Sequence, residues 1–367
     1  MKKTLISASV ASVLTLASFG ALAESPSFYG RLDLSVTNSD TSTTLQGGTN
    51  GATVGESGTY LENNFSHIGV KGSESLTSNI DVIYQMEFQV ENTSGNSDTF
   101  KSRNTFLGLK SANLGTVLVG RNDTVFKQAE GGIDAFGNTN ADIDRLVAGQ
   151  TRAADGIWYY SPKIADLVTL NATYLMTDNN QGAGTDSDSQ YALSATLGDK
   201  KLKAQNYYVA GAYNKGIGSI DAYRAVAQVK FGDFKIGGLF QNTESNKYDN
   251  LEGNTYFVNA VYNLNGVNLK VQYGVDESGL SSKYFGNSFA YKNPNDSDTD
   301  VNETNALLAT VSDVNVQNIT IGADYKISKS TMVYGHYAMY KGDYTIASNK
   351  KDLEDDSVFT IGMRYNF

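Results

Sequence analysis

The last eleven residues constrain the fold of this chain most, because apolar and polar side chains alternate there up to the final residue. One face carries Phe359, Ile361, Met363, Tyr365 and Phe367, and the other carries Thr360, Gly362, Arg364 and Asn366. A period of two residues is typical of a β-strand with unlike faces. A soluble sheet has no reason to end on Phe, whereas a strand between lipid and water places an aromatic residue at the bilayer interface. The ending therefore predicts the closing strand of a membrane barrel.

The first 23 residues have the layout of a secretory signal peptide. Lys2 and Lys3 form a basic start, residues 5–19 are mostly apolar, and Ala21-Leu22-Ala23 is a small-x-small cleavage site. The apolar stretch is shorter than the ~20 residues that a membrane-spanning helix needs. We expect cleavage after residue 23, export through the periplasm, and one barrel domain over residues 24–367.

Composition agrees with an exported barrel. The chain has 23 Tyr and 16 Phe but only 3 Pro and no Cys, so uninterrupted strands are possible and disulfides are excluded. A mean hydropathy of −0.33 is compatible with a membrane barrel, since half of each strand faces a polar interior. The net charge of −10 argues against a nucleic-acid partner.

The alternation recurs along the chain, and the connections alternate in length. Clear examples of strands are 81–89, 167–174, 223–231, 267–274 and 319–325. Seven short turns separate eight long polar segments, namely 38–64, 92–101, 122–155, 178–189, 214–220, 244–253, 277–315 and 342–356. This pattern predicts an all-β fold, a transmembrane antiparallel β-barrel of 16 strands, and is not typical of a soluble β-sandwich. The count would change if residues 305–311 formed a further short strand.

Several segments in order carry a family resemblance. They are Phe28-Tyr29-Gly30-Arg31-Leu32-Asp33, residues 66–74, 103–110 and 115–122, Tyr159-Tyr160-Ser161-Pro162, and the terminal Phe367. Together they resemble the general diffusion porins of Gram-negative bacteria over nearly the whole mature chain. The resemblance implies the cell outer membrane, a homotrimer, and a third loop folded inward to narrow the pore. It also implies that the barrel-assembly machinery recognises the strand ending at Phe367.

The third loop would span about residues 122–155. The resemblance implies that its carboxylates face basic residues on the barrel wall, and Glu130 and Asp134 are the best candidates by position. Enterobacterial members have Pro-Glu-Phe-Gly-Gly where this chain has Asp134-Ala135-Phe136-Gly137, so the identity of the acidic residue stays open.

The resemblance places the basic side of the constriction on the wall and at the loop end. The candidates are Arg31, Arg103, Arg145 and Arg152, with His67 where the family often has Arg. Alternation independently directs Arg31 and His67 inward. Salt bridges to wall carboxylates such as Asp33 or Glu87 are the alternative for Arg31 and Arg103. Because imidazole gains charge below about pH 6.5, His67 gives the hypothesis that acidification changes conduction mildly; a histidine without a role is the alternative.

The resemblance implies passive diffusion of small hydrophilic solutes and ions, and the acidic balance favours a weak cation preference. A substrate-selective channel for sugar, phosphate or nucleoside is the alternative. An enzyme is not expected, because the only histidines are His67 and His336. Since His336 lies among Tyr334, Tyr337 and Tyr340, it is predicted to belong to an interfacial aromatic girdle. An adhesin with a filled lumen is a further alternative.

No cofactor or metal site is implied by the motifs. The acidic run 293–304 could bind Ca²⁺ or bridge to lipopolysaccharide, but it lacks an EF-hand pattern, and a solvated loop is the simpler interpretation. Outer-membrane lipid and lipopolysaccharide are the expected surroundings of the barrel.

Overall fold

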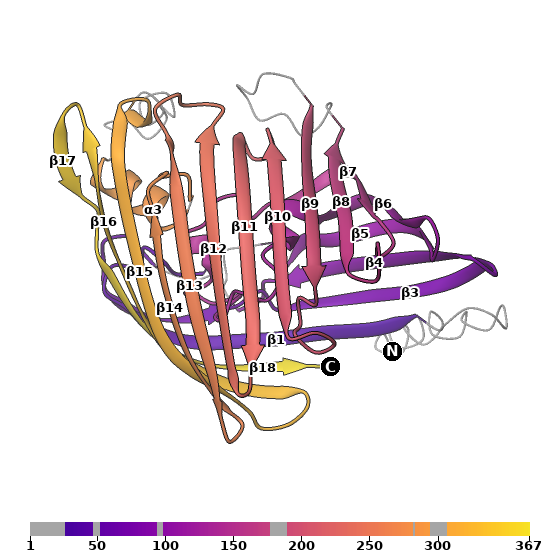
Figure 1. Cartoon of the computed structure of the whole chain (residues 1–367). Coiled ribbons are helices and arrows are strands. Elements are labelled where there is room, and N and C mark those ends of the chain that lie inside the picture. The colour runs from indigo at the N-terminus through magenta and orange to yellow at the C-terminus, as the bar shows by residue number, and fades with distance from the viewer. Residues whose placement is uncertain (1–25, 47–51, 94–97, 177–188, 282, 294–306) are drawn as a thin grey trace, which may run out of the picture.

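The computed structural model describes residues 26–46, 52–93, 98–176, 189–281, 283–293 and 307–367. These residues form one antiparallel sheet whose last strand pairs with its first, so the wall is closed (Figure 1). The strands are β1 (Ser27–Ser39), β2 (Gly58–Asn63), β3 (His67–Thr77), β4 (Ile80–Val90), β5 (Phe100–Ser111), β6 (Gly115–Asp123), β7 (Arg152–Tyr160), β8 (Val168–Leu175), β9 (Gln190–Gly198), β10 (Tyr207–Lys215), β11 (Ile220–Phe231), β12 (Phe234–Ser245), β13 (Glu252–Leu264), β14 (Val267–Asp276), β15 (Val311–Lys326), β16 (Thr331–Ile346), β17 (Asn349–Asp352) and β18 (Asp356–Asn366).

Two of these segments do not add a crossing of the barrel. β2 and β3 pair with successive parts of β1, so together they form one interrupted strand. β17 pairs only with the far end of β16 and lengthens that hairpin. The described residues therefore make sixteen wall strands, which confirms the predicted architecture. Leu307 and Leu308 are helical and β15 begins at Val311, so the described part of 305–311 holds no separate strand.

The last residue of the chain is hydrogen-bonded to the first strand of the wall. Gly30 N donates to the carbonyl oxygen of Phe367 at 2.9 Å, and Phe367 N donates to the carbonyl oxygen of Gly30 at 3.1 Å. The terminal residue is thus part of the seam between β1 and β18. Side chains on the inner face join the same strands, because Arg364 and Tyr334 both donate to the carboxylate of Asp33.

The predicted alternation sorts side chains between lipid and lumen. On β1, Leu32 and Val36 are 48% and 55% exposed on the outside, whereas Asp33 and Thr37 are fully buried on the inside. A strand whose polar face points inward and whose apolar face points outward can cross a bilayer only as part of a closed sheet, because every backbone group must be hydrogen-bonded. None of the helices in the described residues is long and apolar enough to cross a membrane.

An apolar cluster occupies part of the interior. Helix α3 (Tyr284–Lys292), in the connection from β14 to β15, packs Phe285 and Phe289 around Tyr344 of β16. Third-loop residues such as Ile133 and Leu146 belong to the same cluster. In Figure 1, α3 and β17 lie at the upper end of the barrel and the C-terminus at the lower end. The C-terminus and most tight turns share the lower end, which by the usual topology is periplasmic.

Two connections differ in length from the sequence-based expectation. The link between β10 and β11 is only residues 216–219, whereas the periplasmic link between β9 and β10 covers residues 199–206. The second is longer because the side chain of Asp199 accepts hydrogen bonds from three backbone N–H groups and stabilises a wider turn. The predicted signal peptide lies outside the described residues, as does nearly all of the acidic run 293–304.

Candidate functional site

The third loop starts and ends with short turns of helix. Strand β6 ends at Asp123 and β7 begins at Arg152, so the loop covers residues 124–151 and is shorter at both ends than predicted. Thr124 begins α2 (Val125–Gln128) by accepting a hydrogen bond from Lys127 N. Asp142 begins the 3₁₀ turn η1 (Ile143–Arg145) in the same way through Asp144 N. These hydrogen bonds within the loop stabilise its two helical turns independently of its contacts with the wall.

Side chains of the wall hold the loop inside the barrel by its backbone carbonyl groups. The donors and their acceptors are Arg224 Nη2 to Ala148 at 2.8 Å, Gln228 to Gly132 at 2.9 Å, Lys270 to Ala135 at 2.6 Å, Gln272 to Ala141 at 2.8 Å and Arg364 to Gly137 at 3.2 Å. These donors lie on strands from β11 to β18. The inward-folded third loop that the resemblance implied is therefore present, and an extended row of wall donors positions it.

Asn140 connects the middle of the loop to four strands, since its Nδ2 also donates to Thr37 Oγ1 of β1 at 3.2 Å. Its Nδ2 donates to Glu62 Oε2 at 2.7 Å and to Thr360 Oγ1 at 2.8 Å, and its Oδ1 lies 2.6 Å from His336 Nε2. Glu62 is fully buried, so these donors offset the cost of removing its carboxylate from water.

The prediction that His336 belongs to an interfacial girdle is wrong. His336 is only 3% exposed and contacts the third loop, because Tyr334, His336 and Tyr340 share the inward face of β16. Tyr337 has the opposite parity and is 39% exposed on the outer face. The residues are close in sequence, but a strand separates them onto two faces.

An opening of about 550 Å³ remains between the loop and the wall formed by β5 to β7. Its charged lining comprises five carboxylates and four cationic groups. They are Asp123, Glu130, Asp134, Asp142 and Asp144, and Arg103, Lys127, Arg152 and Lys283. Most of the carboxylates belong to the loop, whereas Arg103 and Arg152 belong to the wall.

Four of the predicted site residues come together at this opening. Arg103, Glu130, Asp134 and Arg152 all line it. Both arginines also have wall partners, since Arg103 Nε lies 2.5 Å from Glu87 Oε1 and Arg152 Nε lies 3.1 Å from Asp123 Oδ1. For Arg103 the sequence left two alternatives, a place at the constriction or an ion pair with a wall carboxylate. In the structure Arg103 has both.

Arg31 and His67 lie beside the opening rather than in its lining. They are paired across β1 and β3, and both face inward as predicted. His67 Nε2 is 3.8 Å from Glu87 Oε2, and its Nδ1 lies 2.8 Å from the carbonyl oxygen of Phe65. Glu87 thus connects His67 with Arg103 at the border of the opening.

Arg145 does not reach the opening. Its side chain is 1% exposed, donates to the carbonyl oxygen of Thr44 at 2.9 Å, and pairs with Asp144 at 2.7 Å. The 3₁₀ turn directs it behind the loop, toward residues 41–44. The prediction that it faces solutes in the constriction is therefore corrected, and its role in the structure is to hold the loop.

Burial and mutual repulsion alter the acidity of the loop carboxylates. Burial, followed by the nearby charge of Asp134, raises the pKa of Glu130 to about 7. Burial also raises the pKa of Asp134 and, with the neighbouring Asp144, that of Asp142. The Oε2 atom of Glu130 has no hydrogen-bond partner in the described part of the chain. The charge of the opening therefore depends on pH near neutrality.

Sequence reasoning named Glu87 only as a possible wall partner of Arg31 or Arg103, and it did not assign Asp123, Lys127 or Lys283 to the site. Alternation placed Glu87 inside, but only the pairing of β4 with β5 brings it to Arg103. Asp123 and Lys127 bracket the start of the loop and are 3.4 Å apart. Lys283 belongs to a different long connection, and no local signal in the sequence would have linked it to this opening.

A closed sixteen-strand barrel with an apolar exterior and a charged internal opening defines a membrane channel. The family model described as "Gram-negative porin" matches residues 8–345, and the chain belongs to that family. Proteins of this family and fold are outer-membrane channels rather than enzymes.

Curated relatives agree with this family assignment. The chain is 26% identical to outer membrane porin protein 32 of Delftia acidovorans over 302 residues, covering 75% of this chain and 74% of that protein. It is 29% identical to the major outer membrane protein P.IB of Neisseria sicca, but over only 49% of this chain and 48% of that protein.

A solved structure supports the fold. The anion-selective porin from Comamonas acidovorans superposes with a TM-score of 0.60 at 18% identity, over 94% of this chain and 99% of that chain. At this identity the likeness concerns the fold alone.

Proposed function

We propose that this porin forms a water-filled channel through which small hydrophilic solutes and ions diffuse passively. The observation that carries the proposal is the opening of about 550 Å³ between the third loop and the wall, with charged groups of both signs around it. A passage of this kind suits hydrated solutes because its charged groups replace part of their hydration. Arg103, Glu130, Asp134 and Arg152 would form the constriction, with Arg31 and His67 at its border.

The preference for cations would be weak. Five carboxylates face four cationic groups at the opening, so the balance is only slightly negative even when every group is charged. Protonation of Glu130 would remove that excess. The solved relative from Comamonas acidovorans is anion-selective by its title, so selectivity differs within this fold and depends on such local charges.

The assembly that we propose is a homotrimer. Strands β1 to β6 carry apolar outer side chains such as Leu32, Ile68 and Leu107, which could pack against a second copy as well as against lipid. Assembly by the barrel-assembly machinery would use the β18 segment that ends at Phe367, and lipopolysaccharide would surround the upper rim.

The test is a single-channel current measurement on the purified native oligomer in a planar bilayer. We expect ohmic steps, grouped in threes, and a reversal potential under a salt gradient that indicates mild cation preference. The variants Arg103→Gln and Arg152→Gln should increase that preference, while Lys230→Gln, at the exposed end of β11, should leave it unchanged. Absence of current from a folded, inserted barrel would reject the proposal.

A further inference from the structure

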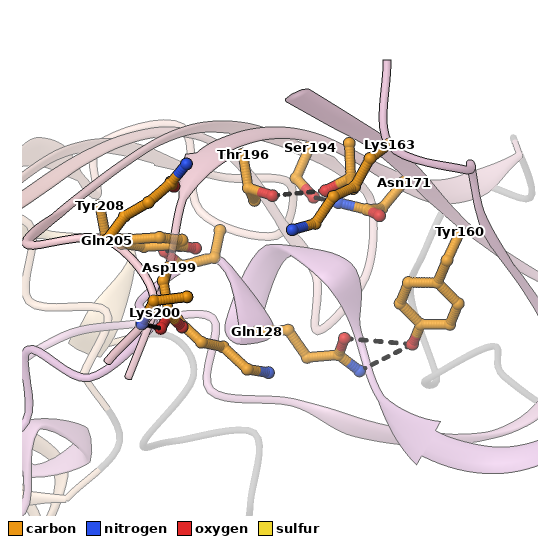
Figure 2. Close-up of a pocket in the computed structure, with 14 residues that line it drawn as sticks. Gln128, Tyr160, Lys163, Asn171, Ser194, Thr196, Asp199, Lys200, Gln205 and Tyr208 are labelled. Atoms are coloured by element: carbon orange, nitrogen blue, oxygen red, sulfur yellow. Dashed lines mark hydrogen bonds between the residues drawn. The ribbon is translucent and has the colours of Figure 1, made fainter. Parts of the chain in front are cut away.

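A polar pocket lies next to the opening, on the periplasmic side of α2. It has a volume of about 490 Å³ and is bounded by the inner faces of β7 to β9, by the turns at Lys163 and Asp199, and by α2 (Figure 2). Lys127 and Glu130 line the opening, whereas Gln128 and Ala129 line the pocket. The start of the third loop therefore separates the opening from the pocket and contributes residues to both.

The connection 199–206 forms one side of the pocket in a fixed conformation. Asp199 accepts hydrogen bonds from the backbone of Lys201 at 2.9 Å and of Lys203 and Ala204 at 2.8 Å each. Leu202 follows with a positive φ of 52° and is buried at 5% exposure. A Cβ atom at Gly132 would lie 2.7 Å from the carbonyl oxygen of Lys200, so this turn touches the third loop directly.

Uncharged hydrogen-bonding groups cover the wall side of the pocket. Asn171 donates to Ser194 at 3.1 Å, and the hydroxyl groups of Thr169 and Thr196 are 2.5 Å apart. Across the space, the amide of Gln128 and the hydroxyl of Tyr160 form a pair at 3.0 Å (Figure 2). Hydroxyl and amide groups both donate and accept, so they can bind several hydroxyl groups of a solute at once.

The charge inside the pocket is positive. In Figure 2 the side chains of Lys163 and Lys200 extend into the space between the wall and α2. Neither ammonium group has a hydrogen bond or ion pair with another described residue. The one carboxylate of the lining, Asp199, is engaged by three backbone N–H groups, which lower its pKa to about 2. Two exposed ammonium groups beside one carboxylate that already accepts three backbone hydrogen bonds leave the pocket with a net positive charge, which favours an anionic ligand.

We propose that this pocket is a binding subsite for small polyhydroxylated solutes that carry one anionic group, as a phosphorylated sugar does. Lys163 and Lys200 would bind the anionic group, and Asn171, Ser194 and Gln128 would bind hydroxyl groups. The volume suits one such molecule, since pockets for small ligands measure roughly 300–1,000 Å³. The inference rests on the proposed channel function and adds a site of retention to a passage that stays open to other solutes.

The experiment measures block of single-channel current by glucose 6-phosphate, with glucose and inorganic phosphate as comparison probes. Glucose 6-phosphate should produce brief blocks, with tighter apparent binding than either comparison probe. The double variant Lys163→Gln/Lys200→Gln should weaken this binding at least about tenfold. Lys201→Gln removes the same charge from the same turn outside the lining, and should leave the block unchanged.

A second variant separates recognition of the hydroxyl groups from charge. Asn171→Ala should weaken block by glucose 6-phosphate while leaving that by inorganic phosphate as it was. Equal block by all three probes, or block that survives the double lysine variant, would overturn the inference. A channel that conducts salt normally but is never blocked would also overturn it while leaving the proposed function intact. Absence of any salt current would instead contradict the proposed function.

Discussion

The guanidinium group of Arg224 lies over the ring of Phe126, 4.2 Å from its centroid, and donates to the carbonyl oxygen of the same residue at 3.2 Å. Its Nη2 also donates to the carbonyl oxygen of Ala148 at 2.8 Å. Phe126 and Ala148 lie near the two ends of the third loop. One buried arginine of the wall therefore holds both ends of the third loop.

Replacing Arg224 with Met should loosen both ends of the third loop. The variant loses three charge-assisted hydrogen bonds, two of them to the loop and one to Gln241, and a cation–π contact. We therefore expect destabilisation of about 2–4 kcal/mol, mostly local to the loop. Thermal unfolding should have a lower midpoint, and the open-channel current should fluctuate more than in the wild type. The control Lys230→Met changes an exposed cation of the same strand. If the current noise of Arg224→Met equalled that of the wild type, other contacts would hold the loop.

Acidification should reduce cation preference through Glu130. Because its pKa is about 7, the carboxyl group is neutral at roughly pH 5 and charged at roughly pH 9. Protonation removes negative charge from the opening, so the reversal potential should move toward anions as the pH falls. Glu130→Gln should remove most of the change between neutral pH and pH 9, whereas Glu244→Gln, at an exposed position of β12, should retain it. An identical pH profile in wild type and Glu130→Gln would contradict this assignment.

Asn140→Ala should detach the middle of the third loop from the seam. The change removes donors to Glu62 and Thr360 and the partner of His336. Leaving the buried carboxylate of Glu62 with fewer donors costs about 1–3 kcal/mol. We expect new conductance substates in single-channel recordings, with the barrel still folded on heated gels. The exposed Asn38→Ala in β1 serves as the comparison, and a single stable conductance level in Asn140→Ala would argue against the role.

The ion pair between Asp33 and Arg364 should stabilise the seam of the barrel. Asp33 is fully buried, so Arg364→Met leaves a carboxylate to which, among the described residues, only the side chain of Tyr334 donates. We expect a loss of about 3–5 kcal/mol, measured as a lower midpoint of thermal unfolding in detergent.

Two comparisons separate this effect from a general loss of charge. Asp33→Asn/Arg364→Met should recover part of the stability, because no unpaired carboxylate remains. Lys215→Met breaks a pair in which the lysine side chain is 41% exposed, and should cost no more than about 1 kcal/mol. Equal destabilisation by Arg364→Met and Lys215→Met would contradict the burial argument.

The architecture was readable from local patterns because lipid and water impose opposite demands on the two faces of every strand. That physical contrast appears in the sequence as a period of two, as in the inward Asp33 and outward Leu32. The prediction of an interfacial girdle failed at His336 because it followed the neighbouring tyrosines in the sequence. Alternation along β16 places His336 on the inward face and Tyr337 on the outward face. The sixteen-strand count followed from the same pattern together with the alternation of connection lengths.

The site was only partly predictable. Arg103, Glu130, Asp134 and Arg152 were assigned from the resemblance, and the structure brings them to one opening. Arg145, assigned in the same way, points behind the loop because the η1 turn and Asp144 direct it there. A loop has no fixed side-chain period, so its sequence does not determine which side chains face the channel.

By itself, the sequence determined which residues face lipid, which face the lumen, and that the strand ending at Phe367 closes the barrel. It could do so because these are properties of each strand against its two surroundings. Only the tertiary structure decided that Arg224 and Asn140 hold the third loop, that Lys283 joins the opening, and that the turn at Asp199 meets Gly132. Those contacts join residues far apart in the chain, and they depend on strand register and loop packing, which local patterns do not encode.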